Sequence, residues 1–240
     1  MREKNILAVI IARKGSKGVP GKNLKLLAGK PLIYYMISTA KEAAIIRNMD
    51  IVLSTDSEKI REFGIKAGIS APFLRPQELA EDNVPSWPVV KHAVIQMELT
   101  KNIKYDIIVY LQPTCPLCKS GTILECISSI EDSAEFVSAV AVTGVSTHPF
   151  RMKRLMSNGY LINLIDQGFE DMRPRQVLPA VYQRAGSVYA SLRKVVMEDG
   201  TLVGEPCKGV IVPKDEAIDI DTELDFLVAE QAMLERESRP

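Results

Sequence analysis

Residues 12–23, ARKGSKGVPGKN, combine three glycines and a proline with four cations, directly after the apolar run ILAVII. The cations are Arg13, Lys14, Lys17 and Lys22. Glycines let backbone N–H groups approach an anion closely, and cationic side chains add charge, so this composition suits an extended polyanion. A solvated basic turn is the alternative interpretation. The glycines at positions 15, 18 and 21 favour phosphate binding.

The loop matches neither of the glycine fingerprints usually associated with phosphates. Five residues separate Gly15 from Gly21 where the Walker motif has four, and Asn23 follows Lys22 where that motif has serine or threonine. The G-x-G-x-x-G spacing of dinucleotide-binding loops is also missing. The residue types therefore indicate phosphate binding, while their spacing leaves the ligand open.

A second candidate is AIDIDTELD, residues 217–225, in which Asp219 and Asp221 alternate with isoleucine. In an extended segment, residues two apart face the same way, so both carboxylates would point to one side. Oxygen ligands of this kind suit Mg²⁺, which binds one or two carboxylates plus substrate phosphates. Asp221 or Thr222 could instead cap the last helix, with Glu223 in its first turn, and the two roles are compatible.

Two further polar segments carry arginines. The stretch LRPQELAEDNVPSWP places three polar side chains before a helix: Arg75, Asp82 and Ser86. The stretch MRPRQVLPAVYQRAGSVYA gathers arginines beside polar and aromatic residues: Arg173, Arg175, Gln176, Tyr182, Arg184 and Tyr189. Arginine forks recognise carboxylates through two hydrogen bonds, although a solvated face is the default interpretation of surface arginines.

The overall charge limits the partners. Thirty basic and thirty acidic side chains cancel, and no basic, aromatic-rich stripe is visible, so we expect no nucleic-acid partner. No apolar run reaches the length needed to span a bilayer, and the N-terminal MREKN lacks the apolar region of a signal peptide. We therefore expect a cytoplasmic protein without a membrane partner.

Cys115 and Cys118 form a C-x-x-C motif after a predicted strand, the position of a thioredoxin-like redox pair. A zinc ribbon would need a second pair, but Cys126 and Cys207 stand alone and the chain has only two histidines. We expect reduced, structural thiols.

Apolar runs alternate with helical patterns over the first half of the chain, which is typical of βαβ units. Strands are expected at ILAVIIA, DIVLSTD, 106–112 and 136–142, and later at AGSVYASL and GVIVP. Helices are expected at 31–44, 57–67, 88–99, 121–130 and 222–235. The pattern predicts a three-layer α/β fold with a mixed, mostly parallel sheet, interrupted by an irregular excursion at 146–182. Because ligands bind at the carboxyl ends of such strands, the cationic loop, Asp56, Gln112 and the segment after GVIVP should share a cleft.

Five motifs in order resemble those of the CMP-sialic acid synthetase family, the acylneuraminate or nonulosonic acid cytidylyltransferases: ARxxSKGxPxKN, RPxELAxD, LQPTxPL, RQxLPxVY and IDIDTExD. The resemblance runs from Ile6 to about Glu235. It implies a nucleotide-diphospho-sugar transferase-like, Rossmann-like fold, with residues 1–240 as a single cytidylyltransferase domain. Residues 146–182 would be an inserted dimerisation and sugar-binding subdomain that reaches across a homodimer.

The implied activity is that of a nucleotidyltransferase in carbohydrate biosynthesis. Such an enzyme transfers CMP from CTP to the anomeric hydroxyl of a nine-carbon 2-keto-3-deoxy sugar acid and releases pyrophosphate, with Mg²⁺ as cofactor. The resemblance assigns nucleotide binding to Arg13, Ser16, Lys22, Asn23, Arg75 and Ser86, with Arg13 and Lys22 also catalytic. It assigns sugar binding to Gln112, Arg175 and Tyr189, and metal binding to Asp219 and Asp221.

The departures from the family pattern concern the sugar side, where PTCPLC replaces PTSPLR. The positions affected are Cys115, Cys118, Gln183, Ala185, Leu202 and Val203. Legionaminate, pseudaminate, a deaminated relative and N-acetylneuraminate are therefore all open as substrates. The alternative enzyme is a cytidylyltransferase for Kdo (2-keto-3-deoxy-manno-octonic acid). Its opening loop typically reads like PARYGSTRLPGKPL, which differs from the loop at residues 12–23 of this chain. A catalytically silent nucleotide-binding module is the second alternative, and the intact Arg13, Lys22, Asp219 and Asp221 argue against it.

Overall fold

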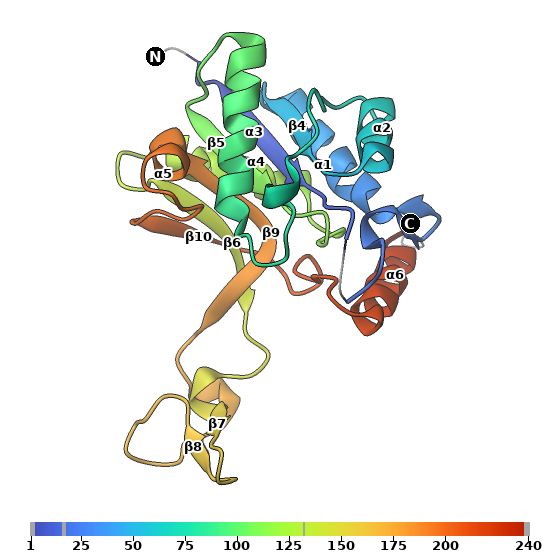
Figure 1. Ribbon diagram of the computed structural model, residues 1–240. Helices are drawn as coiled ribbons and strands as arrows, with labels where there is room; N and C mark the ends of the chain where they lie inside the picture. Colours follow the sequence, from blue (N-terminus) through green and yellow to red (C-terminus); the bar gives the residue numbers. More distant parts are fainter. Residues whose placement is uncertain (1–2, 16–17, 132, 238–240) are drawn as a thin grey trace.

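The apolar run ILAVII forms β1 (Ile6–Ile11), a strand buried on both faces. The computed structural model describes residues 3–15, 18–131 and 133–237 (Figure 1). β1 pairs in parallel with β4 (Asp50–Ser54) on one side and with β5 (Ile107–Leu111) on the other. Because helices cover both faces, its side chains are apolar without alternation.

Three further strands complete a sheet with the order β10-β6-β9-β5-β1-β4: β6 (Ser138–Gly144), β9 (Tyr182–Leu192) and β10 (Cys207–Ile211). β9 runs antiparallel to both of its neighbours, whereas the other pairs are parallel. The mixed, mostly parallel sheet is confirmed. β9 is reversed because the chain returns into it from the same end of the sheet at which β6 leaves.

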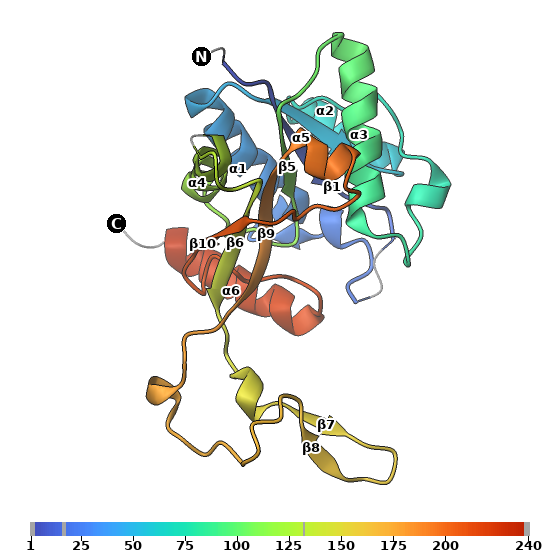
Figure 2. The same cartoon turned by 90° about the vertical axis from the view of Figure 1, so that its left-hand side faces the viewer.

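Helices cover the sheet in two layers (Figure 2). One face packs against α1 (Leu32–Ile46), α2 (Glu58–Lys66) and α4 (Ser120–Glu131). The other packs against α3 (Ser86–Lys101) and the short α5 (Arg193–Met197), which the sequence did not predict. The three-layer architecture is confirmed, and the predicted helices agree with the observed bounds to within two residues. α3 begins before Pro88 because proline is tolerated in the first turn of a helix.

A third cluster of buried apolar side chains lies at the end of the molecule where the loop after β1 is found. Val19, Leu27 and Leu32 pack against Ile220 and Phe226, which precede and begin α6 (Glu223–Glu237). Small elements complete this end: the 3-10 turn η1 (Lys22–Leu24) and the hairpin of β2 (Leu26–Leu27) and β3 (Lys30–Pro31). α6 therefore lies beside the N-terminal loop (Figure 1).

Between β6 and β9 the chain leaves the body as an arm (Figures 1 and 2). It contains η3 (Pro149–Arg151), the antiparallel pair β7 (Lys153–Leu155) and β8 (Leu161–Asn163), and η4 (Arg175–Val177). Large apolar side chains of the arm are exposed, among them Leu155 at 69%, Phe169 at 54% and Met172 at 81%. The arm coincides with the predicted irregular excursion and does not bury these side chains against its own body.

In the part of the chain that the structure covers, no helix combines the length and the apolar character that crossing a membrane requires.

Thr222, and not Asp221, caps α6. The Asp225 backbone N–H donates to Thr222 Oγ1 at 3.2 Å, and the Thr222 backbone N–H donates to Asp225 Oδ2 at 2.7 Å. This reciprocal arrangement satisfies N–H groups at the helix start. The Asp221 carboxylate is therefore not needed for capping.

We predict that Thr222→Ala lowers the free energy of unfolding by about 1 kcal/mol, because the cap is lost. Urea denaturation measures this change. Thr100→Ala is the control, since that hydroxyl bonds only the carbonyl of Gln96 within the exposed part of α3. Equal stabilities of the two variants would contradict the capping role.

Candidate active site

Lys22 connects the loop after β1 to the segment before α6 through two hydrogen bonds. Its Nζ donates to the carbonyl oxygen of Ile220 at 2.6 Å and to Asp221 Oδ1 at 3.2 Å. Gly18 lies against the same segment, because a Cβ at this position would stand 1.8 Å from the Asp221 carbonyl oxygen. Only glycine allows this approach. The cationic loop and the carboxylates thus form one wall.

Other bonds shape the loop from within. Asn23 is buried and donates from Nδ2 to the carbonyl oxygen of Arg13 at 3.0 Å. The Lys14 backbone N–H donates to Asp56 Oδ1 at 2.8 Å. Asp56 therefore contacts the loop, but it lines a separate hollow with Lys14 and Gly21 and not the predicted shared cleft with Gln112. The Arg13 guanidinium forms an ion pair with Asp82. These contacts give the loop a defined shape. Through its ion pair with Asp82, Arg13 lies close to the segment that leads into α3.

Arg75 is a buried cation at the edge of this region, with only 5% of its surface exposed. Nη2 donates to the Ser54 carbonyl oxygen at 2.7 Å, while Nε is buried without a hydrogen-bond partner among the described residues. Burial lowers the pKa of Arg75 to about 10, partly offset by the nearby Asp56 carboxylate. The guanidinium stays charged at neutral pH and keeps donor capacity for a ligand.

A cleft of about 350 Å³ brings most of the predicted site together. The predicted residues that line it are Arg13, Lys22, Asn23, Arg75, Ser86, Gln112 and Asp221. We call it the main cleft. Ser16 lies outside the described residues. Cations and Asp221 stand at the loop side, and Arg75 and Ser86 come from the connection between β4 and α3, so the cleft suits a polyanion carrying a polar group.

A second cleft of about 410 Å³ opens from the main cleft, and we call it the side cleft. Ser86, Tyr110 and Gln112 line both. Tyr189 stacks on Tyr110 with ring centroids 5.4 Å apart, since the two residues pair across β5 and β9. The remaining lining is mixed, with apolar, polar and charged side chains: Pro85, Trp87, Arg184, Thr201, Leu202, Val203 and Glu205. Two ligands could therefore meet at the shared residues.

Asp219 lies behind Asp221 and is largely buried. Its Oδ1 accepts no hydrogen bond of normal geometry from the described residues. Burial raises the pKa of Asp219; the Thr114 hydroxyl lowers it, the Asp221 carboxylate raises it further, and the Lys22 ammonium lowers it. Within the described ranges, no cluster of three or more His, Cys, Asp or Glu side chains could hold a metal. A buried oxygen without a partner beside a second carboxylate fits a cation that takes its other ligands from phosphates.

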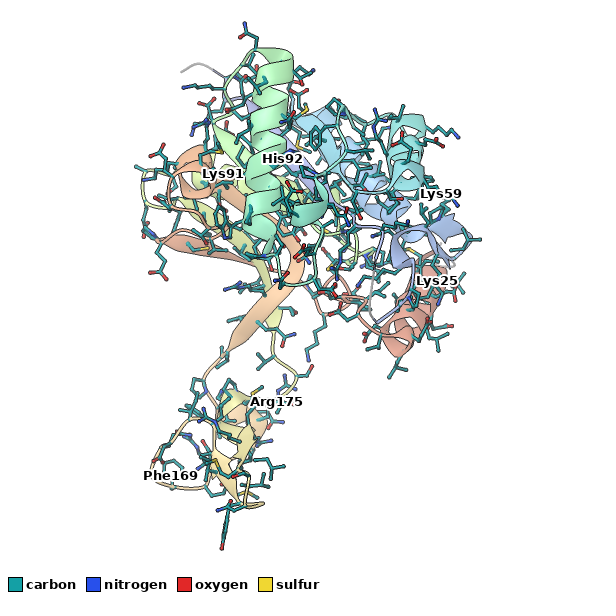
Figure 3. The ribbon with its side chains drawn as sticks, viewed as in Figure 1. Lys25, Lys59, Lys91, His92, Phe169 and Arg175 are labelled. Atoms are coloured by element: carbon teal, nitrogen blue, oxygen red, sulfur yellow. The ribbon has the colours of Figure 1, made fainter. Side chains whose placement is uncertain are left out.

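Arg175 does not join the other sugar-site candidates within this chain. It lies on the arm (Figure 3), where its Nη2 donates to the Val145 carbonyl oxygen. Neither cleft is lined by Arg175. Sequence reasoning also missed Tyr110 and Trp87. Tyr110 was detectable, because it lies two residues before Gln112 in a strand and so faces the same way.

The two C-x-x-C thiols are buried and free, as expected for structural cysteines. Cys115 donates from Sγ to the Ala185 carbonyl oxygen at 3.4 Å. Burial raises the pKa of Cys118 to about 12, so the reactive thiolate is disfavoured.

The chain is similar to known proteins over most of its length. The family model described as cytidylyltransferase matches residues 7–200. A CMP-N,N'-diacetyllegionaminic acid synthase from Legionella pneumophila is 34% identical over 95% of this chain and 96% of its own length. An N-acylneuraminate cytidylyltransferase from Streptococcus agalactiae serotype III is 32% identical over 92% of this chain, which spans only 51% of that relative.

A solved structure, that of a CMP:2-keto-3-deoxy-manno-octonic acid synthetase complexed with CTP, superposes with a TM-score of 0.68. The match covers 97% of this chain and 99% of that one at 18% identity, so it shows a shared nucleotidyltransferase fold.

We predict that Gly18→Ala weakens tripolyphosphate binding at least tenfold, or about 1.4 kcal/mol, because the added Cβ forces the loop away from Asp221. Isothermal titration calorimetry measures the affinity. Gly121→Ala in α4 is the control, because a Cβ there meets nothing within 4 Å and this residue does not line the main cleft. An unchanged affinity in Gly18→Ala would show that contact between the two segments is not required.

Proposed function

The chain belongs to the cytidylyltransferase family, and we propose that it transfers CMP from CTP to the anomeric hydroxyl of a nine-carbon 2-keto-3-deoxy sugar acid, releasing pyrophosphate. The observation that carries this proposal is the joining of the main cleft to the side cleft at Ser86, Tyr110 and Gln112. A triphosphate in one cleft and a sugar in the other would meet there. The relatives at 32–34% identity support a nonulosonic acid.

Two alternatives are less well supported. Likeness to the Kdo-type synthetase is 18% in sequence and concerns the fold alone. A catalytically silent module would not need the cations and carboxylates that stand together at Lys22 and Asp221.

In this proposal the loop binds the nucleotide. Arg13 and Lys22 would contact the β- and γ-phosphates, and Asn23 would hold the loop on the ribose side. A nucleotide-binding role for Ser16 stays a prediction from the family resemblance. Arg75 and Ser86 line the part of the main cleft that would receive the base. The resting partners of the cations, Asp82 and Asp221, are both partly exposed and can release them to a more highly charged ligand.

Asp219 and Asp221 would hold Mg²⁺, since both present carboxylate oxygens near Lys22. When bound, this ion would offset phosphate charge and orient the triphosphate.

The reaction needs no protein nucleophile. The anomeric hydroxyl oxygen forms a bond to the α-phosphorus, the bond from that phosphorus to the bridging oxygen breaks, and pyrophosphate leaves as the hydroxyl loses its proton. Lys22 and Arg13 stabilise the charge that develops on the leaving group.

The sugar acid would occupy the side cleft against Gln112 and Tyr189. Arg175 can contribute only if an arm reaches another protomer, because it lies away from both clefts of its own chain. The exposed apolar side chains of the arm support a homodimer in which residues 146–182 form the contact.

The decisive test is pyrophosphate release from CTP with a panel of acids: N,N'-diacetyllegionaminate, pseudaminate, N-acetylneuraminate, its deaminated form and Kdo. We expect turnover with at least one nine-carbon acid, and little with Kdo, UTP or ATP. Turnover with Kdo alone would favour the alternative enzyme, and no turnover at all would favour the silent module.

For the carboxylate pair, we predict that Asp219→Asn and Asp221→Asn each lower kcat by at least ~10²-fold, the typical cost of losing one stabiliser of transition-state charge. The melting temperature should hardly move, because Thr222 keeps the helix cap. Asp215→Asn is the control, since it removes only a surface pair with Arg236. Near-wild-type turnover of both variants at limiting Mg²⁺ would exclude a metal role.

For the dimer, we predict by light scattering a mass twice that of one chain. Phe169→Glu should shift the protein toward monomers, because a charge in an apolar contact is costly. Ile45→Glu, a change at a residue that is 86% exposed on α1, should not. A fully active wild-type monomer at micromolar concentration would rule out the dimer.

A further inference from the structure

Arg184 is the one cation that lines the side cleft among the described residues. It lies with Tyr189 and Gln112, the two sugar-site candidates that the structure brings together. The family resemblance assigns sugar binding to Arg175, nine positions earlier, which lies on the arm. The cleft therefore contains a guanidinium to which no role has been given.

An irregularity in β9 turns Arg184 into the cleft. Arg184 and Tyr189 are five residues apart, and in a regular strand an odd separation places side chains on opposite faces. The pairing with β6 shifts here: Val140 pairs with Tyr189, but Val142 pairs with Arg184. β9 thus advances five residues while β6 advances two. Such bulges re-aim side chains, and this one brings both residues to the same cleft.

Gly186 lies within the irregularity and has φ +82°, a conformation that favours glycine. A Cβ at Gly186 would also lie 2.9 Å from Asp219 Oδ2. The bend that directs Arg184 into the side cleft is therefore packed against Asp219. Arg184 itself is exposed and lines the side cleft but not the main cleft.

The surroundings of Arg184 leave its charge available. It forms no ion pair with any described residue, and its polar neighbour in the cleft is Tyr189. The other described side chains that line the cleft supply no positive charge: Trp87, Leu202 and Val203 are mainly apolar, Glu205 is acidic, and the rest are neutral. A guanidinium offers a carboxylate two parallel hydrogen bonds.

We propose that Arg184 binds the carboxylate of the sugar acid and so selects acids over neutral sugars, an inference that rests on the proposed function. The carboxylate is bonded to the anomeric carbon, whose hydroxyl is the attacking group. Anchoring it at Arg184 fixes that hydroxyl where the two clefts meet, at Ser86, Tyr110 and Gln112.

The test compares a sugar acid that the wild type accepts with its methyl ester, which keeps the shape and removes the charge. Wild-type kcat/KM should favour the acid by about tenfold to a hundredfold. In Arg184→Ala the acid should fall to the level of the ester, while the ester and the KM for CTP stay unchanged. Arg184→Lys should keep part of the preference, because it retains the charge without the fork.

Gln183→Ala is the matched control, since this neighbour lines neither cleft and should leave the preference intact. Three results would overturn the proposal: an undiminished preference in Arg184→Ala, a raised KM for CTP in place of the sugar effect, or loss of the preference in Arg175→Ala only.

The proposed function and the proposed role of Arg184 can be rejected independently of each other. Wild-type protein that releases no pyrophosphate with any acid would reject the proposed function. Calorimetric titration of N,N'-diacetyllegionaminate and its methyl ester still tests Arg184 in that case, because binding needs no turnover. Tighter binding of the acid that depends on Arg184 would support the proposal, and equal or undetectable binding of the two would overturn it.

Discussion

The site depends on the junction that Lys22 makes between the two ends of the chain. Its side chain is only 14% exposed, and its ammonium is held by the Ile220 carbonyl and the Asp221 carboxylate. A largely buried ammonium without such partners would carry a desolvation cost of several kcal/mol. The loop cations and the carboxylates are therefore held together before any ligand arrives, and the close approach of Gly18 to Asp221 leaves little room for another arrangement.

The rest of the fold holds the parts that meet at this junction. β1 delivers the loop to the carboxyl end of the sheet, and the cluster around Val19 and Phe226 presses α6 against it. On the other side, β9 returns from the arm antiparallel to β5, which stacks Tyr189 on Tyr110 and places Gly186 against Asp219. The main cleft and the side cleft thus share Ser86, Tyr110 and Gln112. The arm lies between β6 and β9, and β9 also carries Arg184 and Tyr189, which line the side cleft.

The sequence predicted those features that depend on residues close together in the chain, namely the strands and the helices. The unbroken apolar run of β1 indicated a strand covered on both faces, and helix periodicity placed the helices well. The alternation of Asp219 and Asp221 with isoleucine predicted that both carboxylates face one side; in the structure Asp219 is largely buried while Asp221 is 76% exposed, and their joint metal role stays a prediction. The cap was settled only by the structure, because Asp221 and Thr222 are chemically equivalent candidates in sequence. The sequence could not show which arginine, Arg175 or Arg184, lies in the sugar site. The place of Arg175 depends on where a long arm projects, and the side to which Arg184 points depends on an irregular pairing between β6 and β9.

The most direct test of this account is a crystal structure of the protein with CTP and Mg²⁺. The account predicts that the triphosphate contacts both segments of the junction, with its β- and γ-phosphates on Arg13 and Lys22 and the metal between them and Asp219 and Asp221. Cytosine should face Arg75 and Ser86, leaving the side cleft open. A nucleotide bound elsewhere, or a triphosphate that touches the loop while both carboxylates stay beyond contact, would contradict it.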